Sequence, residues 1–232
     1  MANRLVMILF AGFLAGSAPA QDAPALKSQK EKLSYALGMD LGNQFRRQST
    51  DVDPALLYQG LKDALAGGKT LLTEEETRAI IAVLQNELAK KQAEANKILA
   101  EKNQKEGEAY LAANKGKEGI VVLPSGLQYK ILKQAEGTKP AADDTVVCHY
   151  RGTLIDGTEF DSSYKRNQPA TFAVKGVIKG WTEALQLMPV GSRWQLFIPP
   201  ELAYGERARG NIIGPNSTLI FEVELISIQG KF

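Results

Sequence analysis

The chain has 232 residues, of which 44% are hydrophobic and 23% are charged, with a formal net charge of +2. No long polar or Gly/Pro-dominated tract interrupts it, so the composition is that of a globular protein. Charges of both signs are interspersed, which gives no indication of a nucleic-acid partner. The length predicts one large domain or two modest ones.

The first twenty residues have the pattern of a secretory signal peptide. Arg4 is the only charged residue among them, residues 5–15 form a short apolar run, and small residues lead to Ala20. We therefore expect a signal peptide over residues 1–20, because a membrane-spanning helix would need roughly 20 apolar residues. Gln21 stands where a lipid-anchored start would need a cysteine, so no stable membrane anchor is expected. The expected location is a bacterial periplasm, with release to the outside as the alternative.

The first half after this segment reads as helix. Apolar residues recur at three- and four-residue spacing from Leu33 to Phe45, which predicts one amphipathic helix. Asp53 followed by Pro54 predicts the start of a second helix, and the glycine pair at 67–68 predicts its end. Together these two helices are expected to make residues 21–72 an N-terminal helical dimerisation region.

A long connecting helix is expected over residues 73–115. Thr73 and Glu76 have the spacing of a capping box, and no proline interrupts the next forty residues. Such a helix would be roughly 60 Å long. Its apolar residues are dense near Ile80 and sparse beyond Leu88, so it is either a solvent-exposed strut or partly paired with another chain.

Two short helices and one end of a strut are too little to bury a hydrophobic core alone. Homodimerisation through residues 27–90 would supply the missing apolar partner. The alternative is a monomeric helical hairpin that folds back on the second domain.

From residue 120 to residue 232 the pattern changes to strands and tight turns. Asp156 and Gly157 join two strand-like runs and are a strong hairpin signal. Only residues 180–188 read as helix, with Trp181 and Met188 on one face. We therefore predict an α+β domain of about five antiparallel strands, in which the sheet wraps its apolar face over one short helix.

The residues that usually carry nucleophilic or metal chemistry are scarce. The chain has one cysteine, Cys148, and one histidine, His149. A single thiol forms no internal disulfide even in an oxidising compartment, and Cys148 is expected to be a small buried hydrophobe. Metal-ligand clusters, phosphate-binding glycine loops and nucleophile elbows are not found. The sequence therefore predicts no metal and no cofactor.

Aromatic residues of the second domain come from segments separated by turns, and some must be ordinary core. Residues drawn from several strands around one helix could also line a single apolar cavity, with Trp181 at its base. Six aromatic residues are candidates for this cavity: Tyr150, Phe160, Phe172, Trp181, Tyr204 and Phe221.

Three ordered stretches are distinctive: "VVCHYRGTLIDGTEFDSSYKRNQPATFAV", "VIKGWTEALQLMPVGSRWQLFIPPELAYG" and "IIGPNSTLIFEVELISI". They closely resemble the FK506-binding-protein (FKBP) family of peptidyl-prolyl cis/trans isomerases, over residues 126–228. The helical first half resembles the macrophage-infectivity-potentiator type of FKBP, which implies a V-shaped dimer with intertwined N-terminal helices. The resemblance also implies proline-containing polypeptides as substrates, no cofactor, and binding of macrolide inhibitors.

The same resemblance implies which residues form the site. Trp181 matches the pocket floor, the Tyr204 hydroxyl and the Ile178 backbone N–H match groups that bond a ligand, and Asp161 matches the pocket carboxylate. Asp161 either contacts the rotating carbonyl or is structural. The catalytic set is Tyr150, Phe160, Asp161, Trp181, Tyr204 and Phe221, and the substrate-binding set is Arg166, Val177, Ile178 and Ile213.

Two features depart from the family's pattern. Ala170 stands where many members carry a pocket-edge aromatic residue, so a more open wall is expected. The loop after Tyr204 carries Glu206, Arg207 and Arg209, where a more apolar or histidine-containing loop is common. We expect an isomerase that assists the folding of exported proteins. The alternatives are a holdase chaperone with incidental isomerase activity and a module that only grips proline-containing segments.

Overall fold

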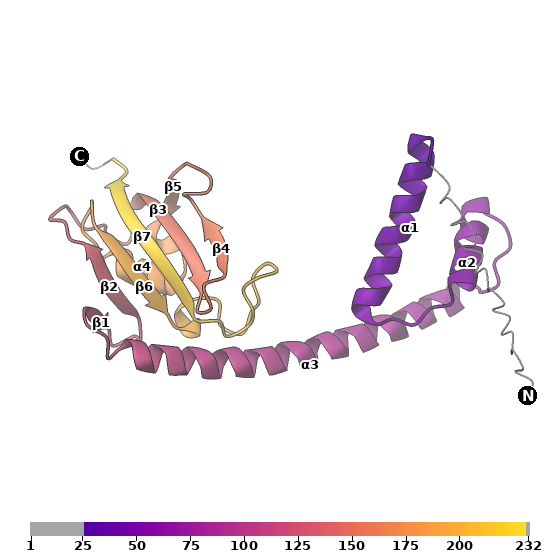
Figure 1. Ribbon diagram of the computed structural model, residues 1–232, viewed down its shortest axis with the longest axis horizontal. Coiled ribbons are helices and arrows are strands. Elements are labelled where there is room, and N and C mark those ends of the chain that lie inside the picture. The colour runs from indigo at the N-terminus through magenta and orange to yellow at the C-terminus, as the bar shows by residue number, and fades with distance from the viewer. Residues whose placement is uncertain (1–25, 231–232) are drawn as a thin grey trace, which may run out of the picture. The chain divides into compact units, whose positions relative to one another are not determined.

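The computed structural model describes residues 26–230 (Figure 1), so the signal peptide expected at 1–20 lies outside the described residues. The chain divides into two compact units, one ending at Thr77 and one beginning at Arg78. Within residues 26–230, none of the helices is both long enough and apolar enough to cross a membrane.

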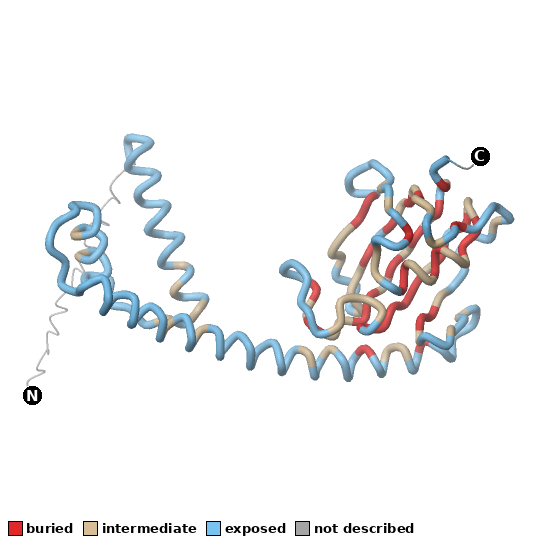
Figure 2. Tube along the Cα trace, turned by 180° about the vertical axis from the view of Figure 1, so that it is seen from behind, coloured by how far each residue is buried: buried red, intermediate tan, exposed pale blue. Residues whose placement is uncertain are grey.

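The N-terminal unit contains α1 (Gln29–Gln48) and α2 (Pro54–Ala66). The Asp53 carboxylate accepts hydrogen bonds from the backbone N–H groups that begin α2, and Gly67 ends this helix with a φ of 64°. Both helix boundaries predicted from the sequence are therefore confirmed. Neither helix contains a buried residue (Figure 2), although each carries an apolar stripe.

The third helix, α3 (Glu74–Asn114), is a single uninterrupted helix of 41 residues, which corresponds to about 60 Å. Its start is the expected capping box. The Thr73 hydroxyl accepts from the backbone N–H of Glu76 at 3.2 Å, and the Glu76 carboxylate accepts from the backbone N–H of Thr73 at 2.8 Å. These bonds satisfy donors that a helix start leaves unpaired.

An antiparallel sheet of seven strands forms the body of the C-terminal unit, in the order β1-β2-β6-β7-β3-β4, with β5 paired to β3. This confirms the α+β class, with two more strands than expected because β1 and β5 have only three and four residues. The strands are β1 (Ile120–Val122), β2 (Gln128–Lys133), β3 (Thr145–Leu154), β4 (Glu159–Ser162), β5 (Ala170–Ala173), β6 (Arg193–Ile198) and β7 (Leu219–Ile228).

The hairpin between β3 and β4 turns at Gly157, whose φ of 87° suits a glycine. Its neighbour Asp156 accepts a hydrogen bond from the backbone N–H of Thr158 at 2.8 Å. The turn predicted at these residues is therefore confirmed.

The short helix α4 (Lys179–Leu185) packs against one face of the sheet (Figure 1) and ends before the predicted residue 188. Trp181, Leu185 and Met188 are buried together with the inward-facing residues of β3, β6 and β7. Gly180 allows the close approach, because a Cβ there would lie 2.6 Å from the Ile198 side chain.

The C-terminal half of α3 docks onto the sheet of its own unit. Asn114 donates to the Gln128 side chain at 3.0 Å, and Gln128 donates to the Leu111 carbonyl at 2.9 Å. The Tyr110 and Phe197 rings lie 6.2 Å apart. The sequence predicted an exposed strut or a partner chain instead, because the docking residues are largely polar and leave no apolar stripe to detect.

Gly107 marks the closest approach of α3 to the sheet. A Cβ at Gly107 would lie 2.3 Å from the Thr218 hydroxyl oxygen and 3.2 Å from the Thr218 Cβ. Thr218 is buried and close to the start of β7, so its side chain would have to shift to admit a methyl group at position 107.

Gly107→Ala should therefore lower the thermal midpoint of unfolding. Overpacking costs about 1–3 kcal/mol and outweighs the gain of about 1 kcal/mol from the better helix propensity of alanine. The double variant Gly107→Ala/Thr218→Ala should recover part of the loss, because the clashing hydroxyl is gone. A rise in the midpoint of the single variant, measured by calorimetry, would contradict this close packing.

Candidate active site

A cavity of about 690 Å³ opens in the C-terminal unit, between the sheet and the start of α4. Every residue of the two predicted site sets except Arg166 lines it. The lining residues are Tyr150, Phe160, Asp161, Phe172, Gly176, Val177, Ile178, Trp181, Tyr204, Arg209, Gly210, Asn211, Ile212, Ile213 and Phe221.

Trp181 joins the hydrophobic core to the cavity. Only 3% of its surface is exposed, and it has edge-on contacts with three rings. The ring centroids of Tyr150, Phe172 and Phe221 lie 5.4, 5.5 and 5.2 Å from that of Trp181. Edge-to-face packing at these distances is favourable for aromatic rings. The arrangement fixes the Trp181 ring within the cavity lining.

The rest of the aromatic wall comes from β3, β4 and β7. Phe160 packs edge-on against Phe221, with ring centroids 5.4 Å apart. Gly152 lies behind both rings, and a Cβ there would come within 2.5 Å of Phe160 and 2.8 Å of Phe221. The strand backbone of β3 therefore directly supports these two rings.

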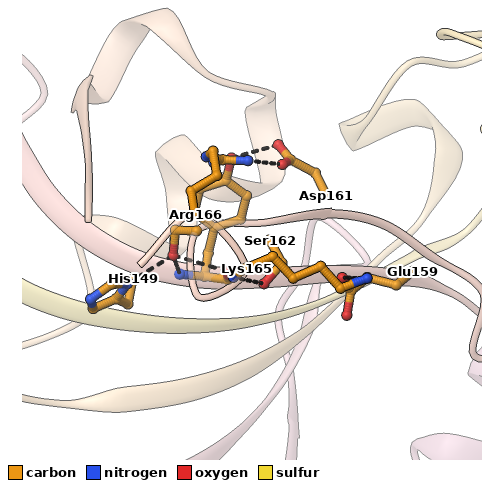
Figure 3. A network of polar contacts seen from close by, with 8 residues as sticks. His149, Glu159, Asp161, Ser162, Lys165 and Arg166 are labelled. Atoms are coloured by element: carbon orange, nitrogen blue, oxygen red, sulfur yellow. Dashed lines mark hydrogen bonds and ion pairs between the residues drawn. The ribbon is translucent and has the colours of Figure 1, made fainter. Parts of the chain in front are cut away.

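One polar cluster interrupts this wall. The Tyr150 hydroxyl donates to Oδ2 of Asp161 at 2.5 Å, and Nη2 of Arg166 donates to the Tyr150 hydroxyl oxygen at 2.8 Å. Nη1 of Arg166 also donates to Oδ1 of Asp161 at 2.5 Å. Figure 3 shows the guanidinium facing the carboxylate. Arg166 does not line the cavity; it holds the other two side chains through these bonds.

The cluster determines the charge state of the site. Desolvation by burial raises the pKa of Asp161, but hydrogen bonds from Tyr150 and Arg166, with the positive charge of Arg166, outweigh it and leave the pKa below its ordinary value. Desolvation and the bond to Asp161 raise the pKa of Tyr150. At neutral pH the cavity therefore contains an ionised carboxylate and a neutral phenol.

Besides the buried indole N–H of Trp181, two further polar groups at the cavity have no partner within residues 26–230. No described group accepts a hydrogen bond from the backbone N–H of Ile178, which precedes the first turn of α4. The Tyr204 hydroxyl is likewise unpaired among the described residues, while the Arg209 guanidinium lies 6.0 Å from the Tyr204 ring centroid. Both groups are available to a bound peptide.

The two departures from the family's pattern also affect the cavity. Ala170, in β5, does not line it, whereas Arg209 does. The backbone N–H of Arg209 donates to the Ile213 carbonyl at 2.8 Å, which makes residues 209–213 a small hairpin along one wall.

Several lining residues were missing from the predicted site sets. Phe172 could have been included, because it belongs to the aromatic group noticed in the sequence. Gly176, Gly210, Asn211 and Ile212 gave no comparable signal, since their backbone position brings them to the cavity.

The only cysteine of the chain lies in the interior of the unit. Burial raises the pKa of Cys148 to about 12. The thiol therefore stays protonated at neutral pH, and thiolate is the nucleophilic form. Cys148 is an ordinary core residue.

Arg166→Leu should raise the pKa of Asp161, because it removes both a hydrogen bond and a positive charge from the carboxylate. Carboxyl ¹³C NMR titration would measure the shift. Arg151→Leu is the matched control: Arg151 bonds Glu159 at 2.6 Å on the same strand pair and does not contact Asp161.

Because folding lowers the pKa of Asp161, the free energy of unfolding should decrease as the pH falls. The stabilising contribution of Asp161 is fully present above its unfolded-state pKa and is lost as the pH falls through its folded-state pKa. Equal Asp161 midpoints in wild type and Arg166→Leu would show that the ion pair does not control this ionisation.

Comparison with known proteins agrees with the fold and the cavity. Residues 136–226 match the family of FKBP-type peptidyl-prolyl cis-trans isomerases. Residues 30–131 match the domain amino terminal to FKBP-type peptidyl-prolyl isomerase. The two matches cover most of the chain.

Two relatives match over nearly the whole length of both chains. The outer membrane protein MIP of Legionella longbeachae is 51% identical over 99% of this chain and 99% of its own length. The peptidyl-prolyl cis-trans isomerase Mip of Coxiella burnetii is 43% identical over 99% of this chain and 100% of its own. The crystal structure of FkpA from Escherichia coli superposes with a TM-score of 0.66 at 36% identity, covering 88% of this chain and 98% of that one. The chain therefore belongs to the FKBP-type peptidyl-prolyl cis-trans isomerases and is a peptidyl-prolyl cis-trans isomerase.

Proposed function

We propose that this isomerase accelerates Xaa–Pro rotation in exported polypeptides and thereby assists their folding, with the aromatic cavity as its catalytic site. The observation that carries this proposal is that nine of the ten predicted site residues line one cavity around Trp181. The expected signal peptide and the relative named an outer membrane protein support export, and we infer a bacterial periplasm as the location.

Rotation about an Xaa–Pro bond is accelerated by an environment of low polarity and needs no nucleophile. Resonance gives the C–N bond partial double-bond character, and rotation about it has a barrier of ~20 kcal/mol. In the twisted transition state the nitrogen loses conjugation, so charge separation across the amide falls. Water stabilises the planar amide better than the twisted one. An apolar aromatic cavity therefore favours the transition state relative to the ground state.

We assign the main role to the aromatic wall and positioning roles to the unpaired polar groups. The Tyr204 hydroxyl and the Ile178 N–H would hold peptide carbonyls, while the proline ring lies against Trp181. Asp161 acts mainly by fixing Tyr150, because both carboxylate oxygens already accept short hydrogen bonds. Binding of macrolide inhibitors in this cavity stays a prediction.

Trp181→Leu should lower kcat/KM by about tenfold, which equals ~1.4 kcal/mol in the barrier, because the ring that three aromatic neighbours pack against is lost. Trp194→Leu is the matched control. Trp194 is also 3% exposed but stacks on Tyr129 at 4.2 Å and does not line the cavity. Both variants should lose stability, yet only Trp181→Leu should lose activity in a protease-free Xaa–Pro assay. Equal losses of activity in the two variants would show that Trp181 has no special role in catalysis.

We propose further that the protein is a homodimer through residues 27–90. No described residue in this range is buried. Even the apolar side chains are exposed, for example Leu37 at 63% and Leu65 at 80%. Exposed apolar side chains in such number indicate an interaction site, and a second copy would provide a matching apolar face in a symmetric arrangement. The same surface could instead hold unfolded clients, as in the chaperone alternative.

Leu37→Glu combined with Leu61→Glu should convert the dimer to a monomer, because each copy would bury two charges at the interface. Light scattering after gel filtration would measure the mass. Lys62→Glu changes one charge on α2 and serves as the control with an unchanged mass. A wild-type monomer that suppresses aggregation of a proline-free client would overturn the dimer proposal and favour the chaperone.

A further inference from the structure

We propose that Asn103, on the long helix α3, is a positioning residue of the isomerase site. Its side-chain amide would hold the base of the loop whose hairpin, residues 209–213, forms one wall of the cavity. This inference rests on the proposed function of that cavity. It makes the C-terminal half of α3 part of the catalytic unit rather than only a connection.

Few hydrogen bonds hold the hairpin of residues 209–213 in place. Residues 206–212 are exposed, and the hairpin is closed by the reciprocal backbone bonds of Arg209 and Ile213, at 2.8 and 3.3 Å. At its base, the backbone N–H of Asn216 donates to the Gly205 carbonyl at 2.7 Å. The position of the wall is therefore set mainly by the segment that leads from Ile213 to β7.

Asn103 bonds this segment directly. Its Nδ2 donates to the Pro215 carbonyl at 2.8 Å and lies 3.4 Å from the Ser217 hydroxyl oxygen, which in turn donates to the Gly214 carbonyl at 2.9 Å. These bonds join parts of the chain that are more than a hundred residues apart in sequence. The Asn103 amide thus holds the Pro215 carbonyl directly and is linked to the Gly214 carbonyl through the Ser217 hydroxyl.

Gly214 shows how closely the helix and the loop approach. A Cβ at Gly214 would lie 2.9 Å from Nδ2 of Asn103 and 3.1 Å from the Leu99 side chain. Leu99, Asn103 and Gly107 follow at four-residue spacing, so they share one face of α3. That face meets Gly214, Pro215 and Thr218 in turn.

A second cavity, of about 440 Å³, lies on the α3 side of the hairpin. Residues 210–213 line both cavities, while Leu99 and Asn103 line only the second one. Residues 209–212 of the hairpin are therefore exposed between two open spaces, and packing into the core holds only its last residue, Ile213. Loss of the anchor at Asn103 would let the wall move away from a bound peptide.

Asn103→Asp tests the proposal with little change in volume, because the carboxylate has the same shape but no N–H to donate. Gln104→Glu is the matched control. It makes the same charge change on the next residue of α3, where the side-chain amide donates only to Glu108, at 3.0 Å. Two readouts are compared for both variants and wild type: Xaa–Pro isomerisation kinetics, and backbone amide NMR of residues 209–213.

For Asn103→Asp we expect KM to rise by about three- to tenfold, the effect of one lost hydrogen bond. We expect kcat to stay nearly unchanged, because Asn103 does not line the cavity around Trp181. The amide order parameters of residues 209–213 should fall in this variant and stay at wild-type values in Gln104→Glu.

Unchanged hairpin amides in Asn103→Asp would overturn the proposal, and so would altered amides with wild-type KM. The NMR readout does not depend on activity. If wild type failed to accelerate isomerisation, the proposed function would fall, while the amide comparison would still decide whether Asn103 positions the wall.

Discussion

The close packing of α4 against β6 is the constraint on which the rest of the site depends. Gly180 leaves no room for a side chain beside Ile198, and the next residue, Trp181, is thereby buried within reach of rings from β3, β5 and β7. The interactions that bury the core also build the cavity floor. Rigidity of the aromatic wall is thus a consequence of folding, in keeping with the close packing of protein interiors.

The polar cluster adds charge to this wall without adding a group that exchanges protons near neutral pH. Asp161 stays ionised and Tyr150 stays protonated, because each is bonded to the other and to Arg166. Rotation about an amide breaks no bond, so the site has no need of a proton shuttle. The buried Cys148 thiol, whose pKa burial raises to about 12, is equally unreactive.

Local signals in the sequence predicted much of the fold. The cap at Asp53, the capping box at Thr73 and the turn at Gly157 each have a short-range physical cause, and each is present in the structure. The aromatic cavity was also foreseeable, although the roles of its residues came from family resemblance. The docking of α3 was not foreseeable, because it uses Asn103 and Gly107 rather than an apolar stripe.

In the proposed mechanism the aromatic cavity stabilises a twisted amide by removing it from water, with no proton transfer. The most direct measurement is kcat/KM for cis-to-trans conversion of a short Xaa–Pro peptide, in H₂O and in D₂O, between about pH 5 and pH 9. This mechanism predicts strong acceleration, a solvent isotope effect close to one, and no dependence on the ionisation of Asp161 over this range, since the pKa of Asp161 is lowered. A bell-shaped profile with a large isotope effect would contradict it, because proton transfer would then limit the rate.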